Sequence, residues 1–212
     1  MEEPVPTASP IKILALGDSY TRGESVVFAK NFPNQLADSL RADGRHVVQT
    51  RIIAQTGWRT DQLQTAMTDA HIGDSTYDLV TLCIGVNNQY QHGSFNTFKT
   101  QFEQLLQTAI ARSGQRKERV IVVSIPDWAY TPYGQHFSST PNQISQEIDQ
   151  YNQASQVIAG QYGIQYVNIT DISRQGLMQP DLVADDGLHP SATQYTEWVK
   201  RLLPVVRVAL AE

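Results

Sequence analysis

Short apolar runs alternate along this chain with longer stretches in which apolar and polar residues are mixed. The apolar runs contain many β-branched residues, as strands buried inside a sheet do. The first of them, Ile-Lys-Ile-Leu-Ala-Leu, fits a strand that is covered on both of its faces. The pattern predicts strands over residues 11–16, 47–54, 77–84, 119–125 and 164–169.

The mixed stretches carry apolar residues at three- and four-residue spacing, which is typical of a helix with one buried face. Thr60 and Ser94 are candidate helix caps, and Thr140 is a cap candidate followed by a proline suited to a first helical position. Pro204 is expected to kink the last helix. The pattern predicts helices over residues 31–43, 60–70, 95–110, 141–163 and 191–210.

This alternation predicts one architecture. Strands that alternate with helices form a parallel sheet covered by helices on both faces. Right-handed crossovers make 2-1-3-4-5 the simplest strand order, as in flavodoxin. We therefore predict a three-layer α/β/α fold with a five-stranded parallel sheet. The 212 residues suit one domain, and we expect a flexible tail over residues 1–10 and a single domain over 11–212.

Composition narrows the classes of function. The net charge of −5 and the scattered basic residues argue against a nucleic-acid partner. No apolar run is long enough to span a bilayer, and the first residues lack the pattern of a signal peptide. We expect a soluble protein, either cytoplasmic or exported after loss of a leader. The single cysteine, Cys83, is expected to be a buried thiol, and the scattered histidines, His71 among them, predict no metal site.

The first candidate for chemistry is Ser19, in the stretch Gly17-Asp18-Ser19-Tyr20 directly after the first strand. Open α/β sheets keep their ligands and catalytic groups just beyond the carboxyl ends of central strands. Asp18 or Ser19 would also serve as an ordinary helix cap, so this stretch alone leaves both interpretations open.

Three later stretches favour chemistry. Gly57 follows the second strand, Gly85-Val86-Asn87-Asn88 follows the third, and Asp186-Gly187-Leu188-His189 lies near the C-terminus. In the predicted order, the loops after the first three strands meet at one crevice. In this order and over nearly the whole chain, the four motifs resemble the SGNH hydrolases, also called GDSL esterases and lipases.

The resemblance implies a serine esterase that works through an acyl-serine intermediate. Ser19 would be the nucleophile and His189 its base. Asp186 would orient the imidazole; Asp185 fits the spacing nearly as well, and the resemblance selects Asp186. The oxyanion donors would be the backbone N–H groups of Ser19 and Gly57 and the side-chain amide of Asn87. Many family members carry aspartate where this chain has Asn88.

The substrate is predicted from the polar stretch between Asn87 and Ser94 and from the absence of a spare amphipathic lid helix. Both favour a short acyl group, such as acetyl, on a polar or carbohydrate alcohol. The candidate substrate contacts are Trp58, Asn88, Tyr90 and Trp128. We expect no cofactor, and the sequence leaves the oligomeric state open.

Alternative functions remain at this point. A GDSL lipase, lysophospholipase or acyltransferase would act on longer acyl chains. A catalytically silent carbohydrate-binding module would lack one of the three triad residues, and all three are present. A flavodoxin-like flavin or nucleotide binder would need a phosphate-cradling loop after the first strand, where Asp18 would repel phosphate.

Overall fold

The computed structural model describes residues 9–70, 75–137 and 141–211, so His71 and the expected cap Thr140 lie outside the described residues. The strands form one parallel sheet in the order β2-β1-β3-β4-β5, which confirms the predicted fold. Their bounds are β1 Ile11–Asp18, β2 Val47–Gln55, β3 Leu79–Cys83, β4 Val120–Val123 and β5 Gln165–Val167.

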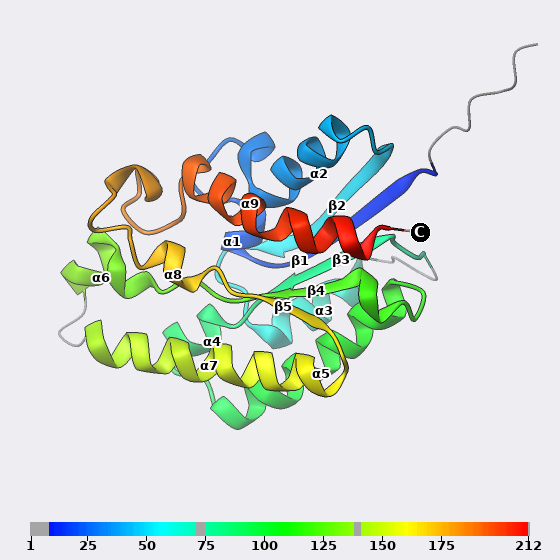
Figure 1. Cartoon of the computed structure of the whole chain (residues 1–212). Helices are drawn as coiled ribbons and strands as arrows, with labels where there is room; N and C mark the ends of the chain where they lie inside the picture. The colour runs from blue at the N-terminus through cyan, green and yellow to red at the C-terminus, as the bar shows by residue number, and fades with distance from the viewer. Residues whose placement is uncertain (1–8, 71–74, 138–140, 212) are drawn as a thin grey trace, which may run out of the picture.

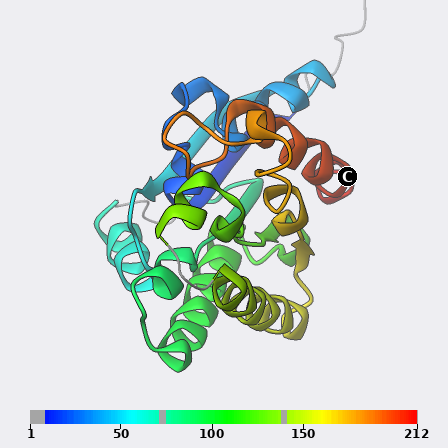
Figure 2. The same cartoon turned by 90° about the vertical axis from the view of Figure 1, so that its left-hand side faces the viewer.

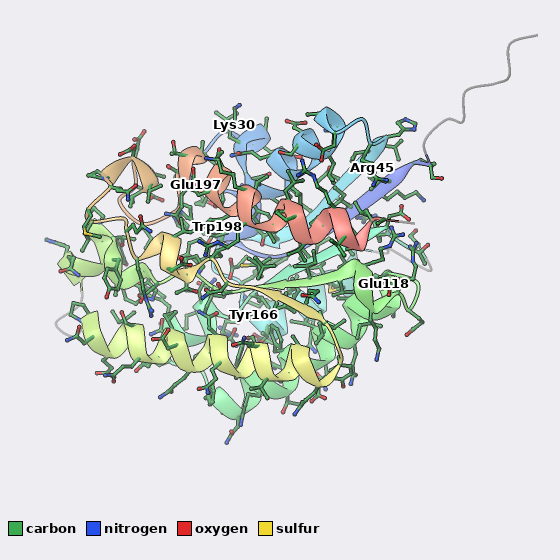
Figure 3. The ribbon with its side chains drawn as sticks, viewed as in Figure 1. Lys30, Arg45, Glu118, Tyr166, Glu197 and Trp198 are labelled. Atoms are coloured by element: carbon green, nitrogen blue, oxygen red, sulfur yellow. The ribbon has the colours of Figure 1, made fainter. Side chains whose placement is uncertain are left out.

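Long helices cover both faces of the sheet (Figure 1). One face carries α2 (Phe32–Ala42) and α9 (Ala192–Ala209), and the other carries α3 (Thr60–Asp69), α5 (Phe95–Arg112) and α7 (Pro141–Gln161). Trp198 of α9 packs on Phe32 of α2, with ring centroids 5.8 Å apart, and Figure 3 shows Trp198 in this layer.

The centre of the sheet is sealed from solvent. Residues 13–16 of β1 and all of β3 are buried, because both strands have a neighbour on each side and helices above and below. Cys83, the last residue of β3, is a fully buried free thiol, as expected. Neither face of such a strand contacts solvent, so polar residues are not needed at every second position. This explains why the sequences of these strands are almost continuously apolar.

Short helices, whose ranges the hydrophobic pattern did not predict, follow the strands at the carboxyl end of the sheet. They are α1 (Ser19–Arg22), α4 (Val86–Tyr90), α6 (Pro132–Phe137) and α8 (Thr170–Ser173). Figure 2 views the sheet from this end, with α6 toward the viewer. Helices this short have no periodic pattern to reveal them, and caps and tertiary contacts hold them.

The helix boundaries confirm some predicted signals and correct others. Ser94 and Ser191 cap α5 and α9 by accepting hydrogen bonds from Thr97 N and Gln194 N. Thr60 is not a cap: Arg59 holds that position, and the Thr60 hydroxyl bonds to other elements instead. The last helix includes Pro204 within one element, and the kink expected at Pro204 stays a prediction.

Within the part of the chain that the structure describes, no helix combines the length and apolar character needed to cross a bilayer.

Candidate active site

Ser19 stands at the turn where β1 becomes α1, and only 4% of its surface is exposed. Asp18 caps this turn, because its Oδ1 accepts a hydrogen bond of 3.0 Å from Tyr20 N. Gly17 is required for close packing: a Cβ there would lie 2.1 Å from Thr21 Oγ1 and 2.4 Å from the Cys83 carbonyl oxygen. The glycine lets β1 and the turn pack closely against the end of β3. This close packing sets the position of Ser19.

Asp18 is fully buried beneath the turn, and its second oxygen, Oδ2, has no hydrogen-bond partner. Loss of solvation raises the pKa of Asp18 to about 7, although backbone N–H groups at the turn oppose the change. This carboxyl group therefore titrates near neutral pH, directly behind Ser19.

His189 pairs with Asp186, three residues earlier in the same loop. The distance from His189 Nδ1 to Asp186 Oδ2 is 2.6 Å, while Asp186 Oδ1 accepts hydrogen bonds of 2.9 Å from the backbone N–H groups of Leu188 and His189. The loop thus folds around its own carboxylate. The neighbouring Asp185 is exposed to solvent.

Asp186 has one further partner, Ser25, whose Oγ donates a hydrogen bond of 2.6 Å to Asp186 Oδ2. Partial burial opposes ionisation of this carboxyl group, but the hydrogen bonds from Ser25, from the backbone and imidazole of His189 and from Leu188 outweigh it. Together they lower the pKa of Asp186 to about 2. Asp186 is therefore a carboxylate at any pH at which an esterase works.

Gly57 and Asn87 lie on adjoining segments that hydrogen-bond to each other. Asn87 Nδ2 donates to the Trp58 carbonyl oxygen at 3.0 Å, and Gln91 Nε2 donates to the Gly57 carbonyl oxygen at 2.9 Å. Gly57 has a φ of 83°, and an added Cβ would meet no protein atom within 4 Å. Backbone conformation, rather than crowding inside the protein, is therefore what requires glycine here.

One cavity of about 240 Å³ brings these groups together at the carboxyl end of the sheet. Ser19 and His189 face it from β1 and from the C-terminal loop, and Gly57 and Asn87 face it from the segments after β2 and β3. Larger cavities lie elsewhere on the molecule and contain none of these four residues. The other lining residues are Tyr20, Thr56, Val86, Tyr90, Gln91, Trp128 and Leu188.

The sequence of residues 15–196 matches the model of the GDSL-like lipase/acylhydrolase family. The chain belongs to this family. As a GDSL-like hydrolase it is a serine hydrolase that acts on ester bonds, and its fold is the SGNH hydrolase fold.

Three proteins similar to this GDSL-like hydrolase share less than a quarter of its residues over the matched length. The uncharacterized protein YpmR of Bacillus subtilis (strain 168) is 23% identical over 215 residues, which cover 95% of this chain and 83% of that protein. The crystal structure of TesA has a TM-score of 0.73 at 16% identity, over 94% of this chain and 99% of that one. Axe2, an acetylxylan esterase from Geobacillus stearothermophilus, has a TM-score of 0.65 at 17% identity, over 95% and 96% of the two chains.

Two candidate substrate contacts of this GDSL-like hydrolase are not among the residues that line the cavity. Trp58 is partly buried and packs against the core, while its carbonyl oxygen holds Asn87. Asn88 is buried, and Thr60 uses both ends of its amide: Oδ1 accepts from Thr60 N at 3.1 Å, and Nδ2 donates to Thr60 Oγ1 at 2.8 Å. Asn88 thus links α4 to the start of α3.

The other two candidates, Tyr90 and Trp128, do line the cavity and contact each other edge to face, with ring centroids 5.3 Å apart. Trp128 is only 8% exposed and donates its indole N–H to Gln89 Oε1 at 2.8 Å. Tyr90 is 45% exposed, and its hydroxyl lies 2.7 Å from that of Tyr133. Trp128 is therefore a fixed wall, and Tyr90 lies at the rim.

Sequence reasoning missed three residues that hold the site together: Ser25, Gln89 and Gln91. Gln89 and Gln91 stand in the polar stretch after β3, which looked like a solvated rim. In the structure Gln89 is buried between Trp128 and Glu147, and Gln91 connects Gly57 with Arg59. Their polarity gave no sign of burial, and Ser25 carried no motif at all.

Proposed function

We propose that this protein hydrolyses short-chain esters of polar alcohols, carbohydrate alcohols included, through an acyl-enzyme on Ser19. The observation that carries the proposal is the shared cavity, which Ser19, His189, Gly57 and Asn87 line while Asp186 holds the far side of the imidazole. A nucleophile, a base, an orienting carboxylate and oxyanion donors are the parts that acyl transfer needs.

The first half of the reaction acylates Ser19. Nδ1–H of His189 donates a hydrogen bond to the Asp186 carboxylate, which keeps the proton on Nδ1 and leaves Nε2 free to act as the base. Nε2 takes the Ser19 hydroxyl proton as Oγ attacks the ester carbonyl carbon. The protonated imidazole then gives this proton to the leaving alcohol as the carbon–oxygen bond breaks. In the second half, water replaces the alcohol, and the same proton transfers release the acid and restore Ser19.

The developing oxyanion would be held by the N–H groups of Ser19 and Gly57 and by the amide of Asn87. One of the two Asn87 amide protons is already bonded to the Trp58 carbonyl oxygen, so the other is available to substrate and the amide is fixed in orientation. A donor held in this way needs no rearrangement as negative charge forms.

The size of the cavity supports a short acyl group. A volume of about 240 Å³ is below the range of roughly 300–1,000 Å³ that is usual for drug-sized ligands. The buried Trp128 bounds the cavity on one side, and the exposed Tyr90 offers a ring face at the rim for a sugar or another polar alcohol. The acetylxylan esterase among the structural neighbours gives a precedent for such a substrate on this fold.

The catalytic assignment is tested with Ser19→Ala. Acetyl ester hydrolysis should fall by several orders of magnitude with the circular dichroism spectrum unchanged. A fluorophosphonate probe should label the wild-type protein on Ser19, as located by mass spectrometry, and should not label the variant. Full activity in a variant preparation free of wild-type protein would exclude Ser19 as the nucleophile.

The acyl preference is tested with a series of p-nitrophenyl esters. In the wild type, kcat/KM should be highest from acetyl to butyryl. Trp128→Ala should shift the maximum of kcat/KM to longer acyl chains. Each additional methylene that the enlarged cavity buries should raise kcat/KM of the variant by about fourfold. Tyr130→Ala is the matched control, since this ring lies on the same turn but does not line the cavity. A wild-type maximum at octanoyl or longer would instead favour a lipase or lysophospholipase.

A further inference from the structure

Two donors share a single oxygen of Asp186. Ser25 Oγ and His189 Nδ1 each lie 2.6 Å from Asp186 Oδ2, although Ser25 is 161 residues away from Asp186 in the chain. Oδ1 is occupied by two backbone N–H groups of the same loop. Among the hydrogen bonds of the described residues, the bond from Ser25 is thus the one that connects this carboxylate to the segment after α1.

Ser25 adopts a backbone conformation that serine rarely takes, with a φ of 63°. It follows Gly23, the left-handed residue that ends α1, and Glu24, whose carboxylate accepts a hydrogen bond from Thr56 Oγ1. Residues 24 and 25 therefore bond to the loop that carries Gly57 and to the loop that carries His189. Backbone strain of this kind persists only where surrounding contacts hold it.

We propose that Ser25 is a positioning residue for the catalytic acid–base pair, an inference that rests on the proposed function. Its hydroxyl holds Asp186 Oδ2 in line with the imidazole. It also draws electron density from that oxygen, which weakens the attraction of the carboxylate for the proton on His189. Removing the hydroxyl would leave the carboxylate freer to rotate and a stronger partner for the charged imidazole.

Other titratable groups lie around the imidazole, and the Ser25 variants leave these residues unchanged. Tyr20 of α1 faces His189, with ring centroids 5.5 Å apart, and Tyr20 interacts electrostatically with the buried Asp18 and with Tyr195 of α9. Asp18 titrates near neutral pH because burial raises its pKa to about 7. A comparison between variants that all retain Asp18 therefore isolates the effect of Ser25.

The experiment compares Ser25→Gly, Ser25→Ala and Ser25→Asn with the wild type. Glycine removes the hydroxyl and tolerates a positive φ, alanine removes the hydroxyl but keeps the strain, and asparagine tolerates this conformation and restores a donor. With p-nitrophenyl acetate, the glycine and alanine variants should each lose on the order of fivefold in kcat, with KM nearly unchanged. The acid limb of their kcat/KM profiles should move to higher pH by about half a unit, and asparagine should reverse part of both effects.

The outcomes separate the inference from the proposed function. If Ser19 is labelled by the fluorophosphonate but Ser25→Gly keeps the wild-type kcat and pH profile, Ser25 has no positioning role. A loss in Ser25→Ala alone would assign Ser25 to backbone conformation and would likewise overturn the inference. A wild-type protein that is not labelled on Ser19 would overturn the proposed function, and the inference with it.

Discussion

At the scale of single residues, Asn87 and Asn88 are neighbours with separate tasks. Asn87 lines the cavity with one amide proton committed to Trp58, whereas Asn88 is buried and committed to Thr60. Asn87→Ala should cost roughly 2.7–4 kcal/mol of transition-state stabilisation, mostly in kcat. Steady-state kinetics of the two alanine variants, measured side by side, test this assignment.

Asn88→Ala should instead lower stability, because it leaves the buried Thr60 N–H without its acceptor. We expect a loss of about 1–3 kcal/mol in the free energy of unfolding, measured in urea, with a smaller fall in kcat than Asn87→Ala gives. A larger kcat loss at Asn88 than at Asn87 would move the oxyanion donor by one position.

Asp18 predicts a dependence of stability on pH. Its folded pKa, raised by burial to about 7, lies above the ordinary value of 3.8, so the folded state binds more protons than the unfolded state between these values. The contribution of Asp18 is therefore fully favourable below about pH 4 and is lost as the pH rises to 7. Asp18→Asn keeps an acceptor for Tyr20 N and should be more stable relative to wild type at pH 8 than at pH 5, by a few kcal/mol. Equal differences in unfolding free energy at the two pH values would contradict this account.

At the residue scale, the site residues that could be predicted from the sequence are those that stand in a motif. Ser19, Gly57, Asn87 and His189 stand in recognisable stretches after successive strands, and the structure brings all four to one cavity. Ser25 reaches Asp186 through a bend in the chain and a left-handed conformation. Residue spacing indicates neither feature, so the contact between Ser25 and Asp186 could not be predicted from the sequence.

At the scale of elements, periodicity predicted the long helices and the strands but not the short helices that shape the site. Strand β1 and helix α5 bury enough apolar surface to leave a clear pattern. Helix α4 is a single short element after Gly85, whose φ of 132° and contact with the Phe98 ring exclude a side chain. Its polar sequence looked like a loop, because the partners that bury Gln89 come from distant parts of the chain.

The wall formed by Trp128 depends on how closely α6 packs against it. A Cβ on Gly134 would lie 2.1 Å from the Trp128 carbonyl oxygen, so Gly134→Ala must displace either α6 or the turn that carries Trp128. We expect a loss of about 1–3 kcal/mol in unfolding free energy and a less steep decline of kcat/KM with acyl length.

Gly160→Ala is the control, since a Cβ on this helical glycine meets nothing within 4 Å. It should raise stability by about 0.5–1 kcal/mol and leave the acyl profile unchanged. Thermal unfolding and the p-nitrophenyl ester series test both variants, and a Gly134→Ala protein as stable as Gly160→Ala would show that α6 is not tightly packed on this wall.

At the scale of the whole molecule, the strand order brings segments that are far apart in the chain to one end of the sheet. Because β1 lies between β2 and β3, the segments that follow these three strands lie side by side at the carboxyl end of the sheet. The C-terminal loop brings His189 to the same cavity. This loop is closed on itself, because Val183 and Pro190 form an antiparallel bridge and Ala184 N donates to the His189 carbonyl oxygen at 2.8 Å. The sequence predicted that the segments after the first three strands meet at one crevice. Residue spacing alone did not decide which aspartate of the C-terminal loop contacts the imidazole.

That choice is tested with Asp186→Asn and Asp185→Asn. In Asp186→Asn, the Oδ1 position can still accept the backbone N–H groups of Leu188 and His189, so the loop should keep its shape. The new amide would donate to Nδ1, however, and this forces the imidazole proton onto Nε2, where it blocks removal of the Ser19 proton. We expect kcat to fall by about 10⁴ with the melting temperature nearly unchanged. Among the hydrogen bonds of the described residues, the imidazole bonds to Asp186 and not to Asp185, so Asp185→Asn should leave kcat within about twofold of wild type. If Asp185→Asn proves the more damaging change, Asp185 is the third member of the triad and the contact between Asp186 and His189 serves only to shape the loop.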